Sequence, residues 1–306
     1  MHEQHQPVLL EEVIEGLNIK ENGLYVDGTF GRGGHAKAIL KKLGPDGKLL
    51  VLDKDEAAIQ MAKKIKDKRL LTYHSSIANL QSVIEEIGWM GYVNGIVLDL
   101  GVSSPQLDNA DRGFSFLRDG PLDMRMNQKQ EMDASQWLNQ ADASEIVRIL
   151  KEYGEEPFAR RIAQTIVRER QKQPLLRTSQ LTALIQKIIP AYKRKHHVAT
   201  RTFQAIRIFI NQELEELQRC LLSVLDILSV GGRLCIITFH SLENRIVQRF
   251  IRKLTKVNIP AQIPLQASEM PKPKFKLFRC KIPSESEIQS NIRARSARLT
   301  IAEKLA

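Results

Sequence analysis

The stretch that decides the fold is LYVDGTFGRGGH, residues 24–35. A short apolar run ends at Asp27 and is followed by a turn that contains four glycines. Glycine lets the backbone adopt positive φ and approach a ligand closely. Residues 35–43 then place apolar side chains on one helical face. The stretch therefore predicts a strand, a glycine-rich turn and a helix whose free amide groups face a ligand crevice.

The same alternation continues along the chain on both sides of this turn. Short apolar runs without period-two alternation suit strands that are covered on both faces. Strands that alternate with helices predict a parallel, doubly wound sheet, so the expected fold class is α/β and Rossmann-like. The expected strands are 24–27, 49–53, 70–73, 95–99, 233–238 and 298–302.

A long segment in the middle of the chain shows helix signals and no convincing strand. We therefore predict an α/β domain formed by residues 1–107 and 212–306, with an all-helical substrate-recognition domain inserted at 108–211. One long helix is expected from about residue 202 to 225, because the apolar spacing runs through it without a break. Residues 254–290, rich in Pro, Lys and Ser, are expected to form a long loop.

The charge of the chain points to a polyanionic partner. Lys and Arg number 46 against 35 Asp and Glu, a net charge of +11, and residues 148–210 alone hold 14 basic and 4 acidic residues. Such a concentration in one inserted domain predicts contacts with RNA phosphates. The densest cluster lies at Lys193, Arg194, Lys195 and Arg201, which are the predicted RNA-binding residues.

Cysteine spacing and hydropathy restrict the compartment and the cofactors. The three cysteines lie far apart and show no metal-ligand spacing, so neither a metal site nor a disulfide framework is expected. No apolar stretch is long enough to span a membrane, and the first residues lack the basic and apolar segments of a secretory signal. We expect a cytoplasmic protein without a membrane partner, and leave both a monomer and a homo-oligomer open.

Three aspartates fall at the ends of predicted strands, namely Asp27, Asp53 and Asp99. In open α/β sheets, ligands bind outside the carboxyl ends of the strands. An acid at the end of the second strand, Asp53, is suited to accept hydrogen bonds from the ribose hydroxyls of an adenosine ligand. The spacing therefore predicts a nucleotide-type pocket that includes Asp27, Gly31 and Asp53.

Two adenosine cofactors compete for this pocket. The NAD fingerprint requires Gly-x-Gly-x-x-Gly, but Phe30 fills the second glycine position when the motif starts at Gly28. A motif that starts at Gly31 ends on the tolerated variant, Ala36. The acid before the first glycine, Asp27, instead favours S-adenosylmethionine, whose methionyl ammonium group suits a nearby carboxylate. An NAD-dependent oxidoreductase and a non-catalytic RNA-binding protein remain the alternatives.

Seven segments, taken in order, carry a more specific match. They are His5-x-Pro7-Val8-Leu9-Leu10 and the residues of 27–35, 98–108, 112–116, 119–126, 199–205 and 239–243. With these segments the chain resembles the RsmH (MraW) family of bacterial 16S rRNA cytosine-N4 methyltransferases along its whole length. The resemblance implies methylation of the exocyclic N4 of a cytidine in the decoding region, with S-adenosylhomocysteine as the product. It also implies a donor site that contains Gly33, Gly34, His35, Asp53, Ile77, Asp99 and Gln106.

An acceptor pocket for the cytosine is expected beside this donor site. We hypothesise that the turn from Asp99 through Ser103 and the segment Phe239-His240-Ser241 form it, with Phe239 stacked on the base and His240 or Ser241 at its edge. A cytosine that enters such a pocket has to leave its stack. Structural roles compete with these assignments, because Asp99 could cap the next helix and His240 could be a hydrogen-bonded structural histidine.

Overall fold

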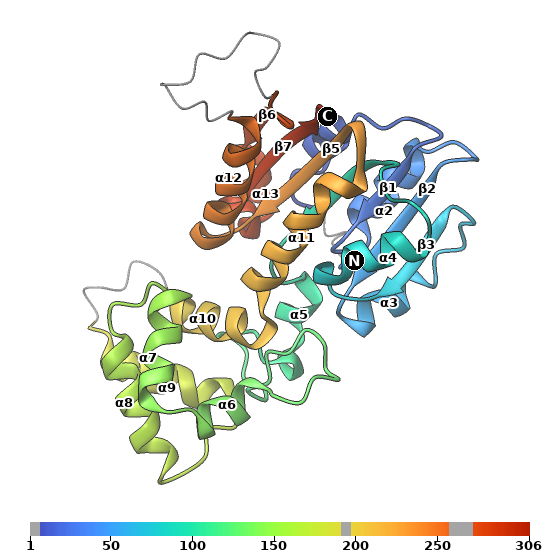
Figure 1. Ribbon diagram of the computed structural model, residues 1–306. Helices are drawn as coiled ribbons and strands as arrows, with labels where there is room; N and C mark the ends of the chain where they lie inside the picture. The colour runs from blue at the N-terminus through green and yellow to red at the C-terminus, as the bar shows by residue number, and fades with distance from the viewer. Residues whose placement is uncertain (1–6, 191–196, 257–271) are drawn as a thin grey trace, which may run out of the picture. The chain divides into compact units, whose positions relative to one another are not determined.

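The computed structural model describes residues 7–190, 197–256 and 272–306. Its contacts divide the chain into two units, Met1–Gly101 together with Leu214–Ala306, and Val102–Glu213 (Figure 1). The first unit is an α/β domain and the second is helical. The predicted boundaries, at 107/108 and 211/212, lie close to those of the two units. No helix of the described residues is long and apolar enough to cross a membrane.

A seven-stranded sheet in the order β3-β2-β1-β4-β5-β7-β6 organises the α/β unit. Strands β1 to β5 pair in parallel, whereas β7 runs antiparallel to both β5 and β6. The strands are β1 (Leu24–Asp27), β2 (Lys48–Asp53), β3 (Leu70–His74), β4 (Val93–Asp99), β5 (Leu228–Thr238), β6 (Phe275–Lys281) and β7 (Arg298–Lys304). The predicted α/β fold class is confirmed, and each of the six predicted strands is present.

Alternate residues of the parallel strands face two separate hydrophobic clusters, so this part of the sheet is covered on both sides. On one face, Val26, Leu50 and Ile96 pack with helices α4 (Leu80–Glu86), α11 (Glu213–Ile227) and α12 (Ser241–Thr255). On the other face, Tyr25, Leu49 and Val97 pack with helices α1 (Leu10–Leu17), α2 (Gly34–Lys42) and α3 (Glu56–Ala62). Burial on both faces explains why these strands are continuous apolar runs.

The helical unit has its own hydrophobic core. Its elements are α5 (Ser104–Asp108), η2 (Ala110–Arg112), α6 (Ala134–Gln140), α7 (Ala143–Glu152), α8 (Ala159–Arg170), α9 (Thr178–Ile188) and α10 (Thr200–Asn211). Trp137 is buried in this core, and Arg125 forms a 2.7 Å ion pair with Asp123. Both residues therefore have structural roles within the unit.

The predicted long helix over 202–225 is wrong, because two helices, α10 and α11, occupy this stretch. Gln212 separates them in the left-handed conformation, with φ +50°. The Asn211 side chain donates to the carbonyl of Met124 and accepts from the amide of Met126, both at 2.7 Å. These contacts fix the end of α10. The apolar spacing continues past this point, so the sequence pattern gives no sign that the backbone leaves the helical conformation at one residue.

The predicted loop over 254–290 is also wrong where the structure describes it. Helix α12 extends to Thr255, β6 forms the edge strand of the sheet, and α13 (Glu285–Ser290) follows with Ser284 as its N-cap. The strand was missed because three basic residues, Lys276, Arg279 and Lys281, interrupt its apolar residues. Lysines on an edge strand oppose pairing with other chains. A further turn, η4 (Ile292–Ser296), leads into β7.

Candidate active site

Three strand ends meet at one edge of the sheet, because β1 lies between β2 and β4. Asp27, Asp53 and Asp99 are the last residues of these three strands. The structure thus brings together the three carboxylates that the sequence places at strand ends. Their mutual repulsion and their burial both disfavour the ionised forms.

Asp53 connects the glycine-rich turn to the second strand. Its Oδ2 accepts a hydrogen bond from the Gly31 amide and its Oδ1 accepts one from the Asp55 amide, both at 2.8 Å. Burial is the main reason that the pKa of Asp53 rises to about 6, although these two hydrogen bonds lower it. Each carboxylate oxygen retains a second lone pair, which can accept a ligand hydroxyl.

Asp27 is the most buried of the three carboxylates, with only 1% of its surface exposed. Its Oδ1 accepts from the Thr29 amide at 3.1 Å, whereas its buried Oδ2 has no partner of good hydrogen-bond geometry among the described residues. The Ala36 amide lies close enough to the carboxylate to lower its pKa slightly. Burial, reinforced by the charge of Asp53, raises the pKa of Asp27 to about 7. A buried carboxylate oxygen without a partner is costly, and is therefore suited to a cationic ligand group.

Asp99 faces a buried histidine. Its Oδ2 lies 3.8 Å from Nδ1 of His35, and its Oδ1 is buried without a hydrogen-bond partner among the described residues. Nε2 of His35 lies 3.1 Å from the carbonyl of Val8, so Nε2 carries the proton and Nδ1 is an acceptor. Burial lowers the pKa of His35 to about 4 and raises that of Asp99 to about 8, where Asp27 and Glu243 add repulsion. Burial therefore favours the uncharged forms of both groups while no ligand is bound.

The glycine-rich turn needs glycine at two of the predicted site positions. Gly33 has φ +73°, and a Cβ atom there would lie 2.5 Å from Cζ of Phe30. A Cβ atom on Gly34 would collide with the Pro7 ring. Any side chain at these positions would displace either the turn or the segment before α1. The turn can therefore keep this conformation, and its backbone can approach a ligand closely, only if both residues are glycine.

Ile77 packs next to the same glycine-rich turn. It is buried at the start of a short 3-10 helix, η1 (Ile77–Asn79), and belongs to the core under the strand ends. A Cβ atom on Gly28 would lie 3.2 Å from Cγ2 of Ile77. Ile77 is thus placed as an apolar wall beside the turn, and contact with an adenine ring stays a prediction.

The turn between β5 and α12 is held by a glutamate. Oε2 of Glu243 accepts from the amides of Phe239 and His240, at 2.8 and 3.3 Å. His240 is the N-cap of α12, and its Nδ1 accepts from the Glu243 amide at 3.4 Å. Its Nε2 lies 3.1 Å from Oε1 of Glu243, at ion-pair distance but without hydrogen-bond geometry. One nitrogen of His240 therefore has a structural role, while Ser241 is exposed in the first turn of the helix.

Ser103 and Gln106 belong to the helical unit. They form a capping box at the start of α5, in which the Gln106 side chain accepts from the Ser103 amide at 2.9 Å. Ser103 is thus the N-cap, so the alternative role of Asp99 as the cap of this helix is wrong. Contacts of Ser103 and Gln106 with substrate or donor stay predictions.

Sequence reasoning missed three groups that shape the site. Thr29 accepts from the Asp99 amide through its Oγ1 at 2.6 Å, and the carbonyl of Val8 sets the tautomer of His35. The third group is Glu243, whose spacing from His240 is that of a capping box and was the one available signal. The other two contacts join residues that are distant in the sequence.

The predicted RNA-binding residues are only partly described. Arg201 is exposed, and its Nη1 donates to the carbonyl of Glu155 at 3.2 Å. Lys193, Arg194 and Lys195 lie outside the described residues. Their role as an RNA contact stays a prediction.

Comparison with known proteins links the chain to a methylase family. The model of the MraW methylase family matches residues 2–305. The ribosomal RNA small subunit methyltransferase H of Coxiella burnetii (strain Dugway 5J108-111) is 56% identical over 99% of both chains. The protein of the same name from Nitrosococcus oceani is 51% identical over 98% of this chain and 96% of its own. Among solved structures, an rRNA methylase from Streptococcus thermophilus covers 100% of this chain and 99% of its own, with TM-score 0.40 and 13% identity.

Proposed function

Because the chain belongs to the MraW methylase family, we propose that it methylates the exocyclic N4 of a cytidine in the decoding region of 16S rRNA. The chain is an S-adenosyl-L-methionine-dependent methyltransferase. The proposal of an rRNA substrate is supported by the 51–56% identity to ribosomal RNA small subunit methyltransferases H along nearly the whole chain. The NAD-dependent alternative is therefore wrong. We further propose that the enzyme acts in the cytoplasm, where it meets ribosomal subunits.

The strand ends suit the methyl donor. When bound, S-adenosylmethionine supplies a methyl group on a positively charged sulfonium. The unpartnered oxygens of Asp27 and Asp99 are matched to its cationic groups, and the free lone pairs of Asp53 to the ribose hydroxyls. Gly31, Gly33 and Gly34 keep the turn close to the ligand, and Ile77 forms an apolar wall.

The acceptor side has to make a weak nucleophile reactive, because the lone pair of cytosine N4 is delocalised into the ring. A carboxylate that accepts a hydrogen bond from the amine favours attack and stabilises the charge that develops on nitrogen. We assign this role to Asp99, and assign to His35 the role of orienting it. Glu243 fixes the amides of Phe239 and His240. We assign to the Phe239 ring, which is partly buried against the core, the role of stacking on an extruded base.

One assay tests the proposed function directly. Small ribosomal subunits from cells that lack the methylation are incubated with labelled donor, and the rRNA is digested to nucleosides. We expect one label per subunit, in N4-methylcytidine from the decoding region, and no label in subunits that already carry the modification. Salt-sensitive RNA binding without any methyl transfer would instead support the non-catalytic alternative.

Donor binding is expected to tighten as the pH rises. Asp27 and Asp99, with pKa values of about 7 and about 8, are mostly protonated at low pH. A cationic ligand favours the ionised carboxylates, so binding has to release their protons. Affinity should therefore increase by about tenfold per pH unit for each proton released between about pH 6 and pH 8. Titration calorimetry in buffers of different ionisation enthalpy measures both the affinity and the released protons.

S-adenosylhomocysteine is the matched control ligand for this titration. It lacks the sulfonium charge but keeps the adenosine and amino acid groups. We expect its affinity to depend less on pH than that of the donor. Equal and flat pH profiles for both compounds would contradict the assignment of the unpartnered carboxylate oxygens to the cationic groups.

A further inference from the structure

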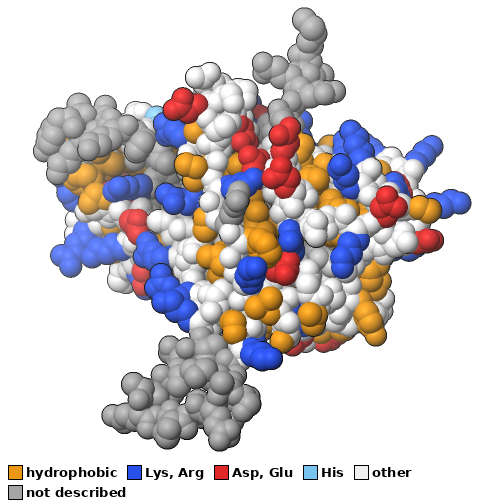
Figure 2. Space-filling model, turned by 90° about the horizontal axis from the view of Figure 1, so that it is seen from above, with side chains coloured by type: hydrophobic (Ala, Val, Ile, Leu, Met, Phe, Trp, Pro, Cys, Tyr) orange, Lys and Arg blue, Asp and Glu red, His pale blue; other side chains and the backbone are white. Residues whose placement is uncertain are grey.

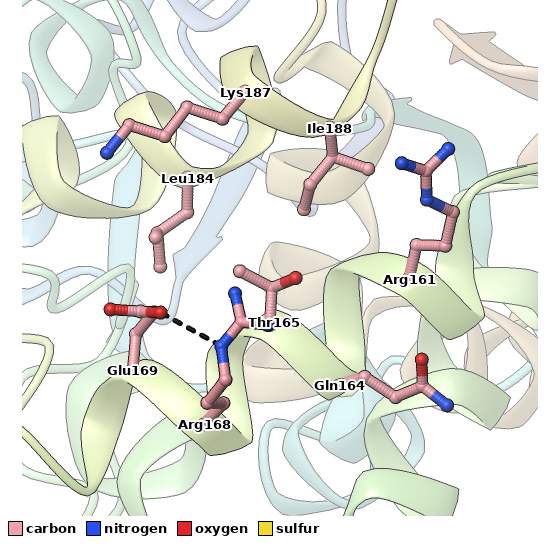
Figure 3. Close-up of a pocket in the computed structure, with 8 residues that line it drawn as sticks. All are labelled: Arg161, Gln164, Thr165, Arg168, Glu169, Leu184, Lys187 and Ile188. Carbon is pink, nitrogen blue, oxygen red and sulfur yellow. Dashed lines mark hydrogen bonds and ion pairs between the residues drawn. The ribbon is translucent and has the colours of Figure 1, made fainter.

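A groove lies between α8 and α9 in the helical unit. Its volume is about 530 Å3, and Figure 3 shows side chains of the two helices facing one another across it. The lining residues are Arg161, Gln164, Thr165, Arg168 and Glu169 of α8, with Leu184, Lys187 and Ile188 of α9. No residue of the predicted donor or acceptor site lies in this groove.

The spacing of the α8 residues places them on one face of the helix. Arg161, Gln164, Thr165 and Arg168 follow the positions i, i+3, i+4 and i+7. The opposite side of α8 packs into the core of the unit through Ile162 and Ile166. The face toward the groove is therefore polar along two turns, and each of its four residues can donate hydrogen bonds.

The charges in the groove leave a positive balance. Three cations and one carboxylate line it, which amounts to a net charge of +2. Glu169 is neutralised by Arg168 at 3.0 Å and by Lys172 at 3.1 Å. Arg161 and Lys187 are exposed, and no ion pair or hydrogen bond joins either of them to another described residue. Two cations are therefore available to an incoming anion.

The residue types of the groove select among possible ligands. Pockets for small apolar ligands have a volume of roughly 300–1,000 Å3 but are lined mainly by apolar and aromatic side chains. Here only Leu184 and Ile188 are apolar, and both lie on α9. Arginine, lysine, threonine and glutamine are the side chains that contact nucleic-acid phosphates and sugars. Figure 2 shows one face of the molecule, on which Lys and Arg side chains are interspersed with acidic and apolar side chains.

We propose that the groove between α8 and α9 binds the phosphodiester backbone of the substrate RNA, with Arg161 and Lys187 as its principal contacts. The inference rests on the proposed function and specifies where the helical unit holds the RNA. The contacts are to phosphates, so they position the substrate without reading its bases. Arg168 is shared between Glu169 and the RNA and contributes less.

A matched pair of double variants tests the groove. Arg161→Gln with Lys187→Gln removes the two available cations, while Arg160→Gln with Lys151→Gln removes two exposed cations of the same unit that do not line the groove. Binding to small ribosomal subunits that lack the methylation is measured over a range of salt concentrations. We expect the groove variant to bind at least about tenfold more weakly, with the slope of log K against log salt reduced by about 2. The control variant should stay within about twofold of the wild type at moderate salt.

Steady-state kinetics and donor titration separate the possible failures. The groove variant should show a raised KM for subunits, with kcat and donor affinity unchanged. If the wild type methylates subunits but the groove variant binds them like the wild type, or the control variant loses as much, the groove proposal is overturned. If the groove variant loses binding but the wild type transfers no methyl group, the groove is supported and the proposed function is overturned. A wild type that neither binds nor methylates subunits overturns both.

Discussion

An Asp99→Asn variant is expected to transfer methyl groups about 10²–10³-fold more slowly than the wild type, because a preorganised charge at the reacting groups is lost. Asn has nearly the same shape as Asp and keeps a polar side chain opposite Nδ1 of His35, which lies 3.8 Å from the Asp99 carboxylate, so the local geometry should persist. Single-turnover kinetics with saturating donor and unmodified small subunits measures the chemical step. Donor titration of the same variant shows whether Asp99 also holds the cationic ligand.

The same substitution is expected to stabilise the protein in the absence of donor. Burial raises the pKa of Asp99 from 3.8 to about 8, so the unfolded state loses a proton that the folded state keeps. Wild-type stability therefore falls as the pH rises through this window, and the fall should be smaller in Asp99→Asn. Because 27% of the Asp99 side chain is exposed, we expect a gain of only about 1–2 kcal/mol near neutral pH.

Asp67→Asn is the control for the methyl-transfer measurement. It removes a carboxylate of the same unit just before β3, at the amino end of the strand, where Asp67 pairs with Arg69 at 2.7 Å. Methyl transfer by this variant should be unchanged. Wild-type rates and donor affinity in Asp99→Asn would contradict the assignment of Asp99 to the site.

A Gly33→Ala variant is expected to lose donor binding and to be destabilised by about 2–4 kcal/mol. A Cβ atom at φ +73° is strained by the left-handed backbone conformation, and it would also lie 2.5 Å from Cζ of Phe30. Phe30 is 3% exposed, so its ring has no open space to move into. Urea unfolding measures the stability, and donor titration of the folded fraction measures the affinity.

Gly88→Ala separates the two contributions. Gly88 has φ +72°, nearly the same backbone conformation, but a Cβ atom there would lie more than 4 Å from every other atom of the described residues that it could meet. This variant should show only the left-handed strain, about 1–2 kcal/mol, and bind donor normally. Equal destabilisation of the two variants would show that the Phe30 contact contributes nothing, and normal donor binding by Gly33→Ala would remove Gly33 from the site.

Much of the α/β unit could be predicted from the sequence because its signals are local. Strands covered on both faces must be apolar at nearly every position, so runs such as the one before Asp27 identify themselves. A parallel sheet with right-handed crossovers then places the carboxyl ends of its strands at one edge. For this reason the sequence alone indicates that Asp27, Asp53 and Asp99 lie at one edge of the sheet.

Other features left no local signal. Gln212 ends a helix in the left-handed conformation without being a glycine, so the apolar spacing continues past it. The strand β6 pairs with β7, which lies later in the sequence, and the Pro- and Lys-rich segment around it suggested a loop. In both cases the outcome depends on long-range contacts, such as those of Asn211 with Met124, that outweigh local propensity.

The sequence by itself determined the doubly wound fold, the three acidic strand ends and the family, because each is encoded in consecutive residues. Only the tertiary structure decided how these groups behave. Among the described residues, one oxygen of Asp27 and one of Asp99 are buried without a hydrogen-bond partner. His35 lies beside Asp99, and the carbonyl of Val8 orients its ring. The tertiary structure also places cationic side chains of two helices of the inserted unit around one groove. Desolvation and contacts between distant residues produce these properties, and neither is written in local sequence spacing.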